Sequence, residues 1–151
     1  MAINRFGSVQ VHVLALSLGM VLSFGFAPVA VAADELPREA VLPLAMATKA
    51  AAAAQEKCRQ DGHRVSVAVV DRAGVLKALV RGDGASPHTT DSSTKKAYTA
   101  ASLRRPTAEL AEMVVKTPIA EGLHYMNDKI LILGGGLPIE IGGEVVGGIG
   151  V

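Results

Sequence analysis

One stretch of this sequence decides the fold: VSVAVVDRAGVLKALV (65–80), RGDGASPHTT (81–90) and DSSTKKAYTAAS (91–102). Apolar residues alternate in its first part, and a second apolar run from Val75 to Val80 follows a break at residues 71–74. This pattern predicts an antiparallel β-hairpin, with Asp71 at the first position of the turn and Gly74 at the last. The other two parts predict a glycine-containing corner and then a helix, whose periodicity is clear from about residue 91.

Helices and further strands are predicted on both sides of this stretch. A helix is expected between Pro43 and Gly62, because proline suits the first turn of a helix and glycine the position after its end. A short helix is expected from Thr107 to about Val115, and Pro118 ends it. The element order predicts an α/β fold with a five-stranded antiparallel sheet and flanking helices. Its last three strands are expected at Lys129–Leu133, Leu137–Ile141 and Glu144–Val151.

Three consecutive glycines, 134–136, separate the first two of these last strands. A phosphate-binding loop would be followed by a helix and by a Gly-Lys-Ser or Gly-Lys-Thr motif, and neither occurs here. The glycines are therefore predicted to form a hairpin turn.

Four motifs carry a resemblance to a known family: VSVAVVDRAGVLKALVRGDGA, KAYTAAS, RRPT and LGGGLPIEIGGEVVGGIGV. Together they resemble the GlcG/HbpS family of haem-binding-like domains, which is related to the C-terminal domain of PduO, over roughly residues 42–151. The resemblance implies a profilin-like sandwich and homo-oligomers. Family members continue with a glycine-rich loop and a final helix, so the sequence either is a fragment or lacks the C-terminal helix of the family. Members are associated with haem, with sensor-kinase partners, with cobalamin enzymes, or with no assigned activity.

The first 32 residues have the pattern of a secretory signal peptide. Arg5 supplies a positive charge, residues 9–31 are almost wholly apolar, and Ala30-Val31-Ala32 is a small-x-small cleavage site. The alternative is an uncleaved membrane anchor, because the apolar run approaches the length of a bilayer span. Cleavage would leave residues 33–151 as one GlcG/HbpS-like domain, periplasmic or secreted and without membrane contact.

The composition argues against a nucleic-acid partner. Signal removal takes away one cation, Arg5, so Lys+Arg falls from 15 to 14 and equals the 14 acidic residues. Phosphate binding depends on clustered cations, and single strands need aromatic side chains to stack on, of which Tyr98 and Tyr125 would remain. The single cysteine, Cys58, is interpreted as a small buried apolar residue.

His88 is the leading candidate for a ligand of iron. Imidazole is the commonest metal ligand among side chains, and His88 lies beside the glycine-containing corner. With the family resemblance added, we expect His88 to bind haem iron; an idle loop histidine is the alternative. At the same corner, Arg81 either pairs with Asp83 or holds a carboxylate such as a haem propionate.

The helix after the corner, if it begins near Pro87, has two different faces. Toward the sheet we expect Thr94, Ala97 and Ala101. On the polar face we expect His88, Ser92, Lys95, Thr99 and Ser102.

Lys95 is a second candidate for binding a propionate, and it also forms a favourable pair with Asp91 four residues earlier. The alternative is that Lys95 belongs to a solvated helix face. His124 lies in a further cluster of side chains that serve as axial haem ligands, at residues 122–126, and an ordinary loop histidine is again the alternative.

Three functions remain open. The first is an exported haem-binding protein that acts as a carrier or sensor, with haem as cofactor. The second is a small enzyme that acts on haem or on a small metabolite. The third is a non-catalytic interaction module for a membrane sensor protein. The sequence contains no paired nucleophile and base, no metal-binding motif and no paired-carboxylate motif, which favours a protein without catalytic residues.

Overall fold

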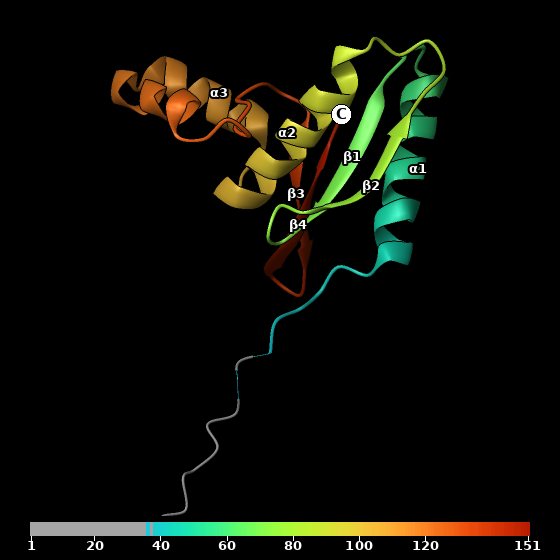
Figure 1. Cartoon of the computed structure of the whole chain (residues 1–151). Coiled ribbons are helices and arrows are strands. Elements are labelled where there is room, and N and C mark those ends of the chain that lie inside the picture. The colour runs from blue at the N-terminus through green and yellow to red at the C-terminus, as the bar shows by residue number, and fades with distance from the viewer. Residues whose placement is uncertain (1–35, 37) are drawn as a thin grey trace, which may run out of the picture. The chain divides into compact units, whose positions relative to one another are not determined.

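The computed structural model describes Leu36 and residues 38–151, so the predicted signal peptide, residues 1–32, lies outside the described residues. Figure 1 shows the order and arrangement of the elements. They are α1 (Leu44–Gln60), β1 (Ser66–Asp71), β2 (Leu76–Arg81), α2 (His88–Leu103), α3 (Thr107–Lys116), the 3-10 helix η1 (Pro118–Tyr125), β3 (Gly136–Ile141) and β4 (Glu144–Gly150). None of the helices in this part of the chain is long and apolar enough to span a bilayer.

The predicted hairpin is confirmed, since β1 and β2 pair antiparallel around the turn at residues 71–74. The Asp71 carboxylate accepts hydrogen bonds from the backbone N–H groups of Ala73 and Val75, at 3.0 and 2.9 Å. Gly74 adopts a φ of 76°, a backbone conformation that glycine enters without a steric penalty. An aspartate that binds the backbone of its own turn, followed by a glycine, is therefore what closes this hairpin.

The sheet contains four antiparallel strands in the order β2-β1-β4-β3, so the α/β class with an antiparallel sheet is confirmed and the count of five strands is not. The strand predicted at Lys129–Leu133 is wrong. In this segment the Leu131 N–H donates to Thr99 Oγ1 of α2 at 2.8 Å, not to a neighbouring strand.

The predicted hairpin turn at glycines 134–136 is wrong for the same reason. Among the described residues, the element directly before them is η1 and not a strand, and Gly136 is itself the first residue of β3. The carbonyl of Gly135 instead accepts a hydrogen bond from the Val151 N–H at 2.9 Å, beside the end of β4. These glycines therefore lead the chain from the surface of α2 to the edge of the sheet.

Helices α1 and α2 cover opposite faces of the sheet (Figure 1). The strand β1 lies in the interior and alternates between them. Val67 and Val69 pack in the cluster that includes Ala47 and Ala51 of α1. On the other face, the second cluster consists of Ala68, Val70, Ala97 and Ala101.

The face prediction for α2 is correct for Ala97 and Ala101 and wrong for Thr99. Thr99, expected on the polar face, is fully buried and accepts the Leu131 N–H. Thr94, expected toward the sheet, is partly buried and lines a groove beside Val75 and Leu76. Buried threonine is tolerated here because its hydroxyl also donates to the Lys95 carbonyl at 2.8 Å, which satisfies the polar group.

Candidate functional site, a groove between α2 and the edge strand β2

The strand β2 presents an apolar strip that α2 leaves open. Opposite residues of an antiparallel pair lie on the same face, and β2 pairs Leu79 with Ala68 and Leu76 with Val70. Because Ala68 and Val70 pack against α2, Leu76 and Leu79 also lie on the α2 side of the sheet. They stay 45% and 42% exposed, since β2 is the edge strand and α2 packs mainly over its neighbours.

The facing wall comes from one stripe of α2. His88, Asp91, Lys95 and Tyr98 are spaced by three, four and three residues, which places them in line on a helix. Between this stripe and the hairpin lies a pocket of about 370 Å³, which we call the α2–β2 groove. Its lining residues are Ala73, Gly74, Val75, Leu76, Asp91, Thr94, Lys95, Tyr98 and Lys129.

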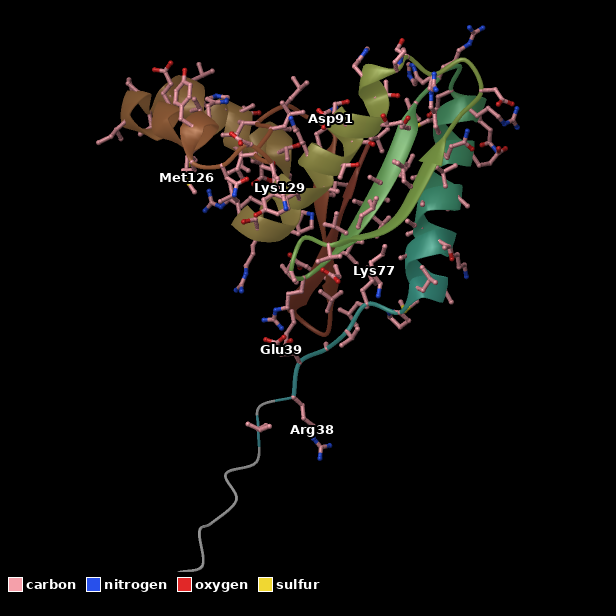
Figure 2. The ribbon with its side chains drawn as sticks, viewed as in Figure 1. Arg38, Glu39, Lys77, Asp91, Met126 and Lys129 are labelled. Carbon is pink, nitrogen blue, oxygen red and sulfur yellow. The ribbon has the colours of Figure 1, made fainter. Side chains whose placement is uncertain are left out.

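Tyr98 packs closely against the hairpin turn. A side chain on Gly74 would meet the Tyr98 ring, since a Cβ at this position would lie 2.5 Å from two ring carbons. On the ring, the Lys129 ammonium lies 5.5 Å from the centroid. Figure 2 shows Lys129 reaching α2 from the loop after η1, while Asp91 lies nearer the start of that helix. The aromatic ring is therefore fixed between a glycine and a cation.

Two cations and one carboxylate line the groove. Lys95 Nζ lies 3.2 Å from Asp91 Oδ2, which confirms the pair predicted from the sequence. The neighbouring lysine, Lys96, is directed elsewhere: its ammonium donates to the Val151 carbonyl at 2.7 Å, and partial burial lowers its pKa. Of these two adjacent lysines, only Lys95 is available to a ligand in the groove.

Arg81 lies on the same side of β2 as Leu79, because it pairs with Ser66. Its guanidinium donates twice to the Ala85 carbonyl, at 3.1 Å from Nε and 2.6 Å from Nη2. Within the described residues it forms no ion pair with Asp83, so the first of the two alternatives for Arg81 is wrong. Arg81 instead holds the corner in shape, and its predicted role toward a propionate stays a prediction.

His88 is the first residue of α2 and is exposed at the end of the stripe. At 1.5 Å per residue, it lies ~10 Å from Lys95 along the helix axis. The preceding turn is ordered by Thr89, whose hydroxyl lies 2.7 Å from Ser66 Oγ and from the Ser86 carbonyl. The structure therefore brings His88, Lys95 and Arg81 to one side of the sheet, with His88 and Arg81 beyond the lining of the pocket itself.

His124 is placed apart from these residues. It lies in η1, which contacts α3, and its exposed ring meets Tyr125 edge-on with 6.4 Å between centroids. It is not one of the residues that line the groove.

Sequence reasoning missed Tyr98 and Lys129 as site residues. Tyr98 continues the spacing of His88, Asp91 and Lys95, so the helical stripe was a usable signal for it. Lys129 had no such signal, because its position depends on a segment that was predicted to be a strand.

Two other pockets of about 380 Å³ each are less suited to a flat apolar ligand with acidic groups. The first lies between residues 39–42 and the hairpin turn and is lined by neither histidine nor lysine. The second, at the end of α1, includes His63 and Arg59. There the Glu56 carboxylate already binds the Arg59 guanidinium at 2.7 and 2.8 Å, and Arg59 together with Gln60 lowers the pKa of Glu56 to about 2.

Chemically, the groove suits a flat apolar ligand with acidic groups at its edge. The described residues contain no cluster of three or more side chains able to hold a bare metal ion. A single imidazole is nevertheless sufficient as a protein ligand when the metal arrives inside a macrocycle.

Comparisons with known proteins agree with this fold. A family model described as haem degrading protein HbpS-like matches residues 42–151. A crystal structure of a double mutant of Streptomyces reticuli HbpS is 46% identical, with a TM-score of 0.72, and covers 82% of this chain and 82% of that one. The protein GlcG of Escherichia coli K12 is 37% identical over 112 residues, which are 74% of this chain and 81% of GlcG. A crystal structure of a PduOC:heme complex is 28% identical, with a TM-score of 0.66, over 74% of this chain and 81% of that one.

Proposed function

The chain belongs to the GlcG/HbpS family, and on that premise we propose that it binds haem in the α2–β2 groove. One observation carries this proposal. An exposed apolar strip, Leu76 and Leu79, lies beside a helix that carries an imidazole at its start and an ammonium two turns later.

Each part of haem has a matching group among the described residues. The macrocycle would cover Leu76 and Leu79, Lys95 would bind a propionate, and the imidazole of His88 would offer a nitrogen to the iron. A pocket of about 370 Å³ is at the small end for ligand sites, so part of the macrocycle would lie over the open strip rather than inside. When bound, haem would supply a redox-active iron. The residues of the chain bind it, orient it and exclude water from one of its faces.

Lys95 supports this role because its present partner is weak and replaceable. An exposed lysine–aspartate pair four residues apart on a helix is worth only ~0.3–0.5 kcal/mol. A ligand carboxylate in the groove therefore competes with Asp91 for the ammonium at little cost.

We extend the proposal to the setting of the protein. The signal-like pattern of residues 1–32 supports export and a carrier or sensor role in the periplasm or outside the cell. Homo-oligomers and a membrane sensor partner stay predictions that rest on the family resemblance.

Adding haemin to the protein from residue 33 onward tests the proposal. We expect a Soret band whose position changes in His88→Ala, with binding weakened about tenfold, or ~1.4 kcal/mol. His124→Ala and His63→Ala are the matched controls, because both remove an exposed histidine outside the groove. No Soret change with the unsubstituted protein would rule out haem binding. A band that persists unaltered in His88→Ala would rule out His88 alone.

Haem degradation is the second candidate function, and the description of the matching family model favours it. Incubation with haem, a reductant and oxygen separates the two candidates. Recovery of intact haem would indicate a carrier, whereas tetrapyrrole cleavage products above the level seen with free haem would indicate an enzyme.

A further inference from the structure

Lys129 is held at the groove by its backbone on both sides. Its N–H donates to Asn127 Oδ1 at 2.7 Å, and two residues later the Leu131 N–H donates to Thr99 Oγ1 of α2 at 2.8 Å. The first bond closes a local turn before Lys129, and the second ties the segment to the helix. The ammonium of Lys129 is thereby kept at the groove although its own side chain is exposed.

The ammonium of Lys129 has a weak partner in the described residues. It lies over the Tyr98 ring at 5.5 Å and takes part in none of the salt bridges formed there. A cation–π contact at an exposed position attracts the cation only modestly and supplies no hydrogen-bond acceptor for its three N–H groups. Lys129 can therefore bind an anion without first breaking an ion pair.

The charge balance of the groove points to what that anion is. Lys95 and Lys129 both line it, and Asp91 compensates only one of them. The side chains around them are largely apolar: Ala73, Val75, Leu76 and the Tyr98 ring. Lysine binds carboxylates as a compact point charge, so two such groups beside an apolar floor suit an apolar ligand with two acidic groups.

We infer that Lys129, supported by Tyr98, binds a second carboxylate of the ligand and makes the groove selective for dicarboxylate macrocycles. This inference rests on the proposed haem site and deepens it. It assigns one carboxylate to Lys95 and the other to Lys129, at the turn end of the groove.

The test compares haemin with haemin dimethyl ester, in which both carboxylates are masked. Three variants are needed: Lys129→Met removes the charge and keeps the length of the side chain, Lys129→Arg keeps the charge, and Lys116→Met is the control. Lys116 is exposed on α3, where it pairs with Glu112 at 3.2 Å, so its loss changes the net charge equally but away from the groove. Since Lys129 is exposed, all three variants should keep the unfolding midpoint of the parent protein.

We expect Lys129→Met to weaken haemin binding roughly fivefold, as for loss of one partly exposed ion pair, and to leave binding of the dimethyl ester unchanged. Lys129→Arg and Lys116→Met should bind both ligands as the parent does. Equal haemin affinity in Lys129→Met, or an equal loss for both ligands, would overturn the role of Lys129 while leaving haem binding intact. A parent protein that binds neither ligand would overturn the haem site and this inference with it.

Discussion

Two glycines of β4 determine where α2 packs. A Cβ on Gly148 would lie 2.2 Å from the Ala97 carbonyl oxygen, and one on Gly150 would lie 2.1 Å from the Ser93 carbonyl oxygen. The backbone of α2 therefore rests directly on β4, as strand glycines permit when another backbone approaches closely. Because α2 packs mainly on β4 and β1, it does not cover the edge strand β2. These residues thus create the groove without lining it.

Replacing Gly148 tests this account at the scale of one residue. The clash is with backbone atoms, which cannot move aside as a flexible side chain can. We expect Gly148→Ala to lower the free energy of unfolding by ~1–3 kcal/mol or more, measured by chemical denaturation.

Gly122→Ala is the matched control, because a Cβ there would have no atom within 4 Å and Gly122 does not have a positive φ. Its stability should be unchanged or slightly higher. If Gly148→Ala proved as stable as Gly122→Ala, close packing of α2 on β4 would not be what positions the helix.

The segment from Lys129 to Leu133 shows why one element was mispredicted. A short run of apolar residues predicts a strand, but periodicity cannot separate a strand from an extended segment that packs on a helix. Here Ile132 is only 7% exposed, so the apolar signal for burial was right. The predicted strand hydrogen bonds were wrong, because the Leu131 N–H donates to Thr99 Oγ1 of α2 and not to a neighbouring strand. That hydroxyl lies more than thirty residues earlier in the sequence, so no local sequence pattern predicts this hydrogen bond.

Thr99→Val tests this contact at the scale of the element. Valine keeps the shape of the side chain but leaves the partly buried Leu131 N–H without a partner, which should lower the unfolding free energy by ~1–3 kcal/mol. We also expect faster hydrogen exchange at the Leu131 amide and weaker haemin binding, because Lys129 belongs to the same segment.

Thr48→Val provides the comparison. Thr48 is an exposed helical threonine whose hydroxyl donates to the carbonyl four residues earlier, Leu44, and it contacts no other element through that hydroxyl. It should lose almost no stability. Unaltered exchange at Leu131 in Thr99→Val would show that the segment is held by the packing of Ile132 alone.

For the whole molecule, the sequence was sufficient to predict those elements whose structure depends on neighbouring residues. The hairpin closed by Asp71 and Gly74 and the start of α1 after Pro43 were predictable because turn and cap residues act on their neighbours. The 3-10 helix η1 was not predicted, since Pro118 was expected only to end the preceding helix. The strand order and the open groove were not, because they depend on how distant backbones approach. The same division holds for the candidate site: side-chain chemistry was enough to propose His88 and Lys95, while proposing Lys129 required the tertiary arrangement.

Export of the protein is expected from residues 1–32 rather than from the folded domain. When the full sequence is expressed in a secreting bacterium, we expect a product that begins at Ala33 in the periplasm or the medium, because Ala30 and Ala32 form a small-x-small cleavage site. Ala32→Asp should block processing, since a charged side chain replaces the small residue at the cleavage position. Intact-mass spectrometry of each cell fraction measures both outcomes.

Ala40→Asp is the matched control, because it makes the same change at an exposed position eight residues beyond Ala32. It should be processed normally. A parent protein of full mass in the membrane fraction would instead support the uncleaved anchor, since the apolar run approaches the ~20 residues that span a bilayer. In that case the groove would meet its ligand at the membrane surface, and a freely diffusing carrier would be excluded while haem binding would not.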